Sequence, residues 1–178
     1  VAFLILSLIF WNYLKIKIIV KNFSKLNSTI PLLFLVLIFL QIIIGAFVSG
    51  MDAGKIYNTW PLMGNSYFPD DSKFIELLNI KVFDNPSIVQ FIHRNLAYLI
   101  VAVYLYSLFF VFTEQNKIIR KPIIIIGISL LFQVFLGIMT ILSGVKIIYA
   151  SLHQINSILI ILSTLYFIYI SKYKERIG

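Results

Sequence analysis

Five long apolar runs constrain the fold of this chain more than any other feature. Four of them reach the roughly 20 residues that a helix needs to cross about 30 Å of hydrocarbon, and the first is shorter. The runs are continuous and lack the alternation of a transmembrane β-barrel, so we predict an all-helical membrane protein with five transmembrane helices. The expected helices are Val1–Leu14, Ile30–Gly50, Ser87–Phe112, Pro122–Ser143 and Ile147–Ile170.

Composition supports a bilayer environment. Of the 178 residues, 60% are apolar and 12% charged, with a mean hydropathy of +0.96. The net charge of +8 is compatible with nucleic-acid binding, but the basic residues lie beside the apolar runs and form no stripe with interleaved aromatics. We therefore expect the lipid bilayer, and no nucleic acid, as a partner. The chain has no cysteine, which excludes disulfides, thiolate ligands and a cysteine nucleophile within these residues.

The positions of the basic residues predict the orientation in the membrane. The positive-inside rule places the segments 15–29 and 113–121 and the tail 172–178 in the cytoplasm. The loop 51–86 then faces outward, and its excess of acidic over basic residues agrees with that side. We expect a multi-pass protein of the cell inner membrane, or of the mitochondrial inner membrane in a eukaryote.

Within the outward loop, residues 71–82 are expected to form a short helix at the membrane surface. Its apolar face would consist of Phe74, Ile75, Leu77 and Leu78.

An internal repeat links the second and fourth runs. Gln41 and Gly45 recur as Gln133 and Gly137, each pair on a helix expected to run outward, and each is followed by a run that contains a histidine. The repeat indicates a duplicated helix-loop-helix unit, whose second copy has a turn of only residues 144–146.

The two histidines of the chain, His93 and His153, both fall inside apolar runs, where an imidazole is costly unless it has a role. His93 follows Pro86, an expected first helical residue behind an Asn85 cap, by seven residues, and His153 follows Lys146 by seven. Both then lie about 10 Å below the outer surface. Two imidazoles at equal depth suit a haem iron, whereas zinc or copper needs further strong ligands that these runs lack.

Two interpretations stay open for each histidine and glycine. A lone membrane histidine most often bonds between helices, and the matched depth is what favours ligation here. Gly45 and Gly137 would give a haem edge clearance, while Gly45, Ser49 and Gly50 equally suit close helix packing.

The polar residues near the histidines also have two interpretations each. Gln41 and Gln133 either bond within the site or join helices. Arg94 either pairs with a haem propionate or extends to lipid headgroups.

Three motifs in combination resemble the haem A synthase family, in its bacterial and mitochondrial branch. They are the run from Gly50 to Met63 with its Asn58-Thr-Trp60-Pro61 sequence, the Gln90 to Arg94 segment, and Leu152-His153-Gln154. The resemblance covers nearly the whole chain. It implies an eight-helix enzyme of two four-helix halves that oxidises the C8 methyl of haem O to the formyl group of haem A for terminal oxidases.

The resemblance further implies that this chain is the C-terminal half, in which His93 and His153 are the axial ligands of a haem b cofactor. The family's N-terminal half carries the residues thought to serve hydroxylation, so no catalytic residue is expected here. Haem O would be the substrate, and haem O synthase or oxidase assembly proteins are possible partners. The loop with Asn58, Trp60 and Pro61 would cap the haem edge or its propionates.

The expected organisation follows from the same resemblance. Residues 1–29 would be the last helix of a missing N-terminal half with its cytoplasmic loop, residues 30–171 a four-helix antiparallel haem-binding bundle, and residues 172–178 the tail. The chain begins inside an apolar run, so we also expect residues upstream of Val1. Two other classes stay open: a standalone bis-histidine b-type cytochrome for electron transfer, and a haem-free transport or assembly protein.

Overall fold

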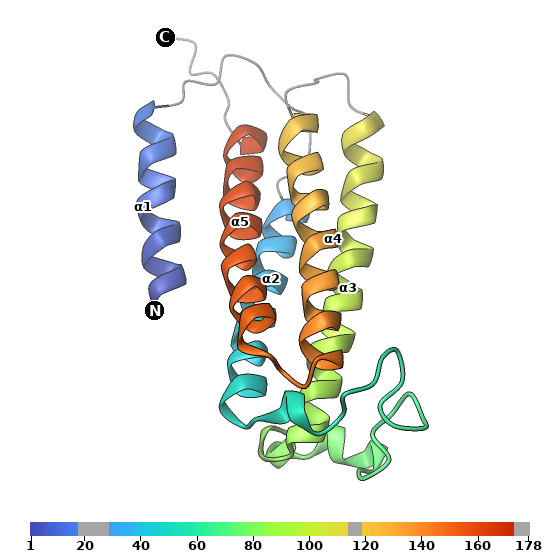
Figure 1. The fold of residues 1–178 in the computed structure, drawn as a ribbon. Coiled ribbons are helices and arrows are strands. Elements are labelled where there is room, and N and C mark those ends of the chain that lie inside the picture. The colour runs from blue at the N-terminus through green and yellow to red at the C-terminus, as the bar shows by residue number, and fades with distance from the viewer. Residues whose placement is uncertain (18–28, 114–118, 173–178) are drawn as a thin grey trace. The chain divides into compact units, whose positions relative to one another are not determined.

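The computed structural model describes residues 1–17, 29–113 and 119–172, and in these ranges the protein is helical (Figure 1). All five predicted apolar helices are confirmed, and the described residues contain no β-strand beyond one isolated bridge between Met63 and Ser66. The α-helices are α1 (Ala2–Lys17), α2 (Thr29–Gly50), α3 (Pro86–Thr113), α4 (Arg120–Leu142) and α5 (Ile147–Lys172), and three short 3₁₀-helices are η1 (Ala53–Lys55), η2 (Phe74–Leu78) and η3 (Ile80–Asp84).

Among the described residues, four helices, α2 to α5, are long and apolar enough to cross a membrane. Many large apolar side chains on them are exposed, including Ile43, Leu105 and Ile128, which is the arrangement that a lipid environment favours and water opposes. The predicted cytoplasmic segments 15–29, 113–121 and 172–178 lie largely outside the described residues, and the orientation stays a prediction.

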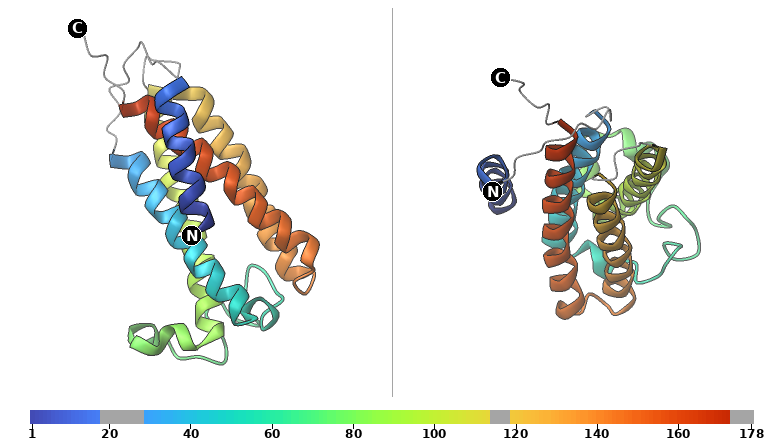
Figure 2. Two further views of the ribbon diagram at one scale, coloured as in Figure 1. Left: turned by 90° about the vertical axis from the view of Figure 1, so that its left-hand side faces the viewer. Right: turned by 90° about the horizontal axis from the view of Figure 1, so that it is seen from above.

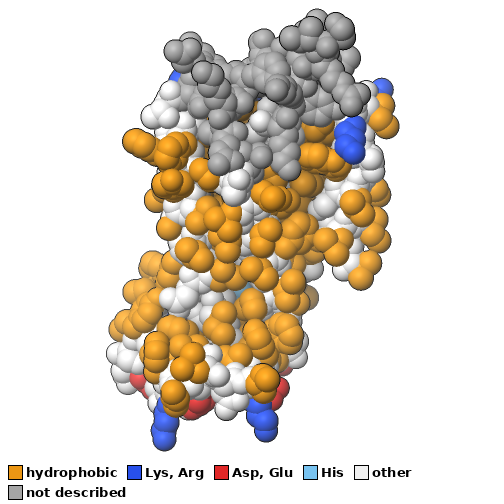
Figure 3. Space-filling view, turned by 180° about the vertical axis from the view of Figure 1, so that it is seen from behind, with side chains coloured by type: hydrophobic (Ala, Val, Ile, Leu, Met, Phe, Trp, Pro, Cys, Tyr) orange, Lys and Arg blue, Asp and Glu red, His pale blue; other side chains and the backbone are white. Residues whose placement is uncertain are grey.

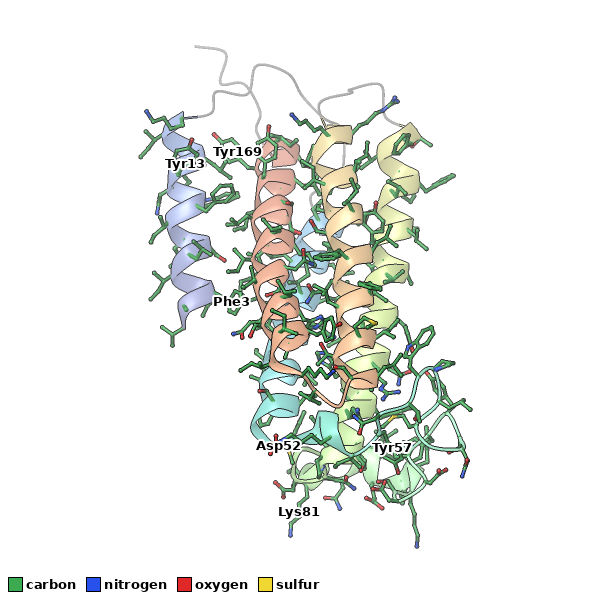
Figure 4. All side chains as sticks on the ribbon, in the orientation of Figure 1. Phe3, Tyr13, Asp52, Tyr57, Lys81 and Tyr169 are labelled. Carbon is green, nitrogen blue, oxygen red and sulfur yellow. The ribbon has the colours of Figure 1, made fainter. Side chains whose placement is uncertain are left out.

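The chain divides into two compact units, and α2 to α5 each contribute residues to both. Unit 1 comprises Val1–Val36, Val101–Phe132 and Ile155–Gly178. In it, Trp11 of α1 contacts Tyr169 of α5 edge to face, with ring centroids 5.7 Å apart (Tyr169 is labelled in Figure 4).

A glycine fixes the packing of α3 on α4 within unit 1. A Cβ at Gly127 would lie 2.0 Å from the hydroxyl oxygen of Tyr104, which donates to the Ile123 carbonyl at 3.3 Å. The tyrosine therefore needs glycine at this position of α4.

Unit 2 comprises Leu37–Ile100 and Gln133–Gln154, and it contains every residue predicted for the site. The end of α4 and the start of α5 lie side by side, joined by a four-residue turn (Figures 1 and 2). The turn places Gly144 at φ 71° and Val145 at φ 62°. The Val145 amide donates to the Thr140 carbonyl at 2.8 Å and closes the C-terminus of α4.

The long loop between α2 and α3 differs from the prediction in one detail. In place of one helix over residues 71–82, it forms η2 and η3, separated by Asn79 in extended backbone (φ −84°, ψ 143°). The Asn79 side chain accepts from the Lys81 amide at 3.0 Å, and this local bond starts a new turn instead of continuing the old one. In Figure 3, charged side chains gather at the end of unit 2 that carries this loop.

Candidate functional site

His93 lies on α3, seven residues after the first residue of the helix, and its depth in a membrane stays a prediction. The Asn85 side chain caps the helix by accepting from the Ser87 amide at 3.0 Å, and Pro86 is the first helical residue, as expected. A Cβ at Gly45 of α2 would lie 3.1 Å from Cε1 of His93, so the glycine gives room to the imidazole ring itself.

Gln41, one turn before Gly45, fixes the state of His93. Its amide nitrogen donates to the His93 carbonyl at 3.0 Å and lies 3.2 Å from Nε2 of the ring. An amide nitrogen only donates, so Nε2 carries the lone pair and the ring proton is on Nδ1. Nδ1 of His93 and Oε1 of Gln41 are both buried without a hydrogen-bond partner.

His153 repeats this arrangement on α5. A Cβ at Gly137 of α4 would lie 3.2 Å from its Cε1, and its Nδ1 lies 3.0 Å from the backbone carbonyl oxygen of Gln133. A carbonyl only accepts, so Nδ1 carries the proton and Nε2 the lone pair. His153 thus has the same tautomer as His93.

The sequence repeat is therefore a structural repeat. In each copy a glycine faces an imidazole from the next helix, and the glutamine four residues earlier bonds to it. The copies differ in the bonding group and in the ring nitrogen: the Gln41 side chain donates to Nε2 of His93, whereas the Gln133 backbone carbonyl accepts from Nδ1 of His153.

Arg94 has partners that the sequence does not predict. It is 7% exposed, and its guanidinium donates to the carbonyls of Leu62 at 3.2 Å and Tyr57 at 3.1 Å. Gln90, one turn earlier on α3, donates to the same Tyr57 carbonyl at 3.0 Å. These contacts attach the long loop to the histidine helix, and pairing of Arg94 with a propionate stays a prediction.

Asn58 attaches the same loop to α4. Its side-chain amide donates to the carbonyls of Ile141 at 2.9 Å and Gly54 at 3.2 Å. Close packing adds to this contact, because a Cβ at Gly54 would lie 3.1 Å from the Val145 side chain. The loop segment 54–62 is therefore bonded to both copies of the repeat. Sequence reasoning missed the role of Gln90, although its spacing of four from Arg94 places both on one helix face.

Asp71 anchors a second part of the loop to the start of α3. It accepts from the hydroxyls of Ser87 at 2.6 Å and Ser72 at 3.0 Å, and its own amide donates to the Tyr57 hydroxyl at 3.3 Å. Burial opposes ionisation of this carboxylate, but the hydrogen bonds outweigh it and hold the pKa of Asp71 below its usual value. Burial raises the pKa of Tyr57.

Fold and site together define a helical membrane protein with a repeated pair of glycine-backed histidines. The chain belongs to the COX15-CtaA family, described as cytochrome oxidase assembly protein, whose pattern matches residues 1–165.

Similar proteins include the heme A synthases of Pelagibacter ubique (45% identical over 168 residues, 94% of this chain and 49% of that protein) and Rickettsia bellii (36% over 169 residues, 89% and 50%). The heme A synthase of Wolbachia pipientis wMel is 43% identical over 134 residues, covering 75% of this chain and 37% of that protein. The chain spans about half the length of the curated relatives it matches. No solved structure matches it.

Proposed function

We propose that this chain is the haem-binding half of a haem A synthase, and that His93 and His153 are the axial ligands of a haem b. One feature carries the proposal: the hydrogen-bond partners of both imidazoles assign the ring proton to Nδ1 and a lone pair to Nε2, which is the form that binds a metal ion, although Gln41 donates to that lone pair in His93. A histidine that binds a metal through Nε2 typically donates its Nδ1 proton to a carbonyl or carboxylate. His153 has this arrangement, because its Nδ1 faces the Gln133 carbonyl.

The donor set also fits a prosthetic group that brings its own equatorial ligands. Within the ranges 1–17, 29–113 and 119–172, no group of three or more His, Cys, Asp or Glu side chains is arranged to hold a metal ion by itself. A porphyrin supplies four nitrogens and needs only two further ligands.

With two imidazole ligands, a bound haem would supply one-electron transfer. The chain's own residues would bind and orient it: Gly45 and Gly137 admit the imidazoles, the Gln133 carbonyl holds the tautomer of His153, and Gln41 would release Nε2 of His93 to the iron while keeping its bond to the His93 carbonyl. In this proposal α2 to α5 form the haem-binding bundle, α1 belongs to an N-terminal half, and that half oxidises the C8 methyl of haem O.

The absorption spectrum of the purified protein, expressed with ample haem, tests the cofactor. We expect a low-spin haem band that His93→Ala and His153→Ala each abolish, and that the neighbouring exposed control Leu152→Ala retains. In His153→Gly, added imidazole should restore the band, which separates lost ligation from failed folding. A colourless wild-type protein would overturn the proposal.

Haem extraction from cells tests the reaction. A strain without the intact gene should accumulate haem O, and the intact gene should restore haem A. Unchanged haem A in the deletion strain, with the haem band present in the protein, would instead indicate a standalone b-type cytochrome.

A further inference from the structure

The two 3₁₀-helices of the long loop expose an unusually apolar surface. Ile80 is 95% exposed, Leu78 84%, Phe74 72% and Ile75 68%. Single exposed apolar residues are ordinary on protein surfaces, but a run of them within seven positions marks a contact surface.

The polar side of this segment is already occupied. Asn85 donates to Glu76 at 3.2 Å and to Ser72 at 3.1 Å, and the other Glu76 oxygen accepts from the Lys73 amide at 3.0 Å. These bonds hold the segment to the cap of α3. The segment is therefore fixed by its polar groups and by a ring contact of Phe74 with Phe68, with centroids 5.6 Å apart, and its apolar side chains stay largely exposed.

The segment is continuous with a membrane-spanning helix. The ring of Phe83 in η3 packs against the ring of Phe47 in the last turn of α2, with centroids 5.3 Å apart. Phe47 is 42% exposed and belongs to a helix long and apolar enough to cross a membrane, which suits a position facing lipid. The contact places η3 beside the end of the span, at the depth where hydrocarbon gives way to headgroups.

Basic residues flank the apolar side chains. Lys73 precedes η2 and Lys81 lies within η3, and both are exposed. The Lys81 side chain projects from the end of unit 2 that the loop forms (Figure 4). Amphipathic segments with apolar side chains beside lysines are typical of elements that lie in the plane of a membrane surface.

We propose that residues 73–83, here called the interfacial foot, lie in the boundary between phospholipid headgroups and acyl chains. Phe74, Leu78 and Ile80 enter the acyl region, and Lys73 and Lys81 stay with the phosphates. The foot holds the Asn85 cap of α3 at the membrane surface and thereby sets the depth of His93. This inference does not depend on haem binding.

Residues 1–178 contain no cysteine, so single cysteines introduced there can be labelled once any cysteine elsewhere in the intact protein is replaced by serine. The intact protein carries a nitroxide at Leu78→Cys or Ile80→Cys, with Lys81→Cys as the matched control from the same segment and Leu99→Cys as the lipid-facing reference in α3. It is reconstituted in vesicles of phosphatidylcholine and phosphatidylglycerol, and the accessibility of each label to oxygen and to a water-soluble nickel chelate is measured.

Labels at Leu78 and Ile80 should favour oxygen over the nickel chelate several-fold more than the label at Lys81, and approach the value at Leu99. Equal access of the nickel chelate at Ile80 and Lys81 would place the foot in water and overturn the proposal. Protection of Leu78 and Ile80 from both reagents would overturn it too, because a protein would then cover the surface.

Discussion

At the scale of single residues, the glycines opposite the histidines have a defined role. A methyl group at Gly45 or Gly137 would lie 3.1 or 3.2 Å from an imidazole carbon, whereas at Gly50 nothing lies within 4 Å. The interpretation of Gly50 as a helix-packing residue thus finds no contact to support it within the described chain, while Gly45 and Gly137 each contact one imidazole.

Gly45→Ala and Gly137→Ala should each displace an imidazole by a few tenths of an ångström. We expect a loss of about 1–3 kcal/mol in the free energy of unfolding, as for other overpacked sites, and a shift in the haem midpoint potential. Gly50→Ala is the control and should be neutral or stabilising, since alanine favours helix by about 1 kcal/mol over glycine. Equal effects at Gly45 and Gly50 would contradict the role given to the imidazole contact.

Substitution of Arg94 distinguishes between two roles of this residue, attachment of the long loop to α3 and binding of a haem propionate. Arg94→Lys cannot reproduce two donors in a planar fork, so the bonds to Tyr57 and Leu62 should weaken by about 2 kcal/mol in total. Hydrogen exchange of amides in residues 57–64 should accelerate, while Lys55→Gln, which removes only an exposed ion pair with Asp52, should leave them unchanged. A changed midpoint potential with unchanged exchange would assign Arg94 to the propionate instead.

At the scale of elements, the hydrogen bond from Asn58 to the Ile141 carbonyl joins the long loop to α4. Substitution of Asn58 measures how much this bond contributes to stability. Asn58→Ala removes the donor to the Ile141 carbonyl, at a cost of about 1 kcal/mol. Asn58→Asp should cost more, because it adds a negative charge beside the negative end of the α4 dipole. Thermal unfolding of the two variants should rank them in this order, and an aspartate variant as stable as alanine would show that the contact is not formed.

The attachment of the loop to α3 should weaken in acid. The pKa of Asp71 is lower in the folded protein than in the unfolded chain, so its contribution is fully present above the unfolded value of about 4 and is lost as pH falls through the lower folded value. The protection factors of the Asp71 and Ser72 amides, corrected for the intrinsic pH dependence of exchange, should fall below pH about 4. Asp71→Asn should abolish this dependence and Asp84→Asn should keep it; persistence in Asp71→Asn would assign the transition to another group.

The sequence predicts the helices better than the contacts of the loop. Helix ends agree within three residues: α1 continues to Lys17 where Leu14 was expected, and α4 begins at Arg120 where Pro122 was expected. Hydropathy marks the part of a helix in lipid, and basic residues extend it beyond that part. The partners of Arg94 and Asn58 were not predictable, because they are backbone carbonyls that no side-chain pattern identifies.

At the scale of the whole molecule, the proposed haem site would draw one contact from each of four helices. Gln41 on α2 and the Gln133 carbonyl on α4 bond to His93 on α3 and His153 on α5, respectively. A ligand held by both imidazoles therefore binds only when all four helices are in place. Its binding free energy adds to the stability of the folded state by mass action.

Haem loading should consequently raise the stability of the protein in a way that depends on both histidines. At free haem about 1,000-fold above its dissociation constant, the gain in the free energy of unfolding is about 4 kcal/mol. Denaturant titration of haem-loaded and haem-depleted protein measures it. His93→Ala and His153→Ala should each lose most of this gain, and Leu152→Ala should keep it. A full gain in either histidine variant would mean that haem binds at another place, and the paired-imidazole site would then need a different ligand.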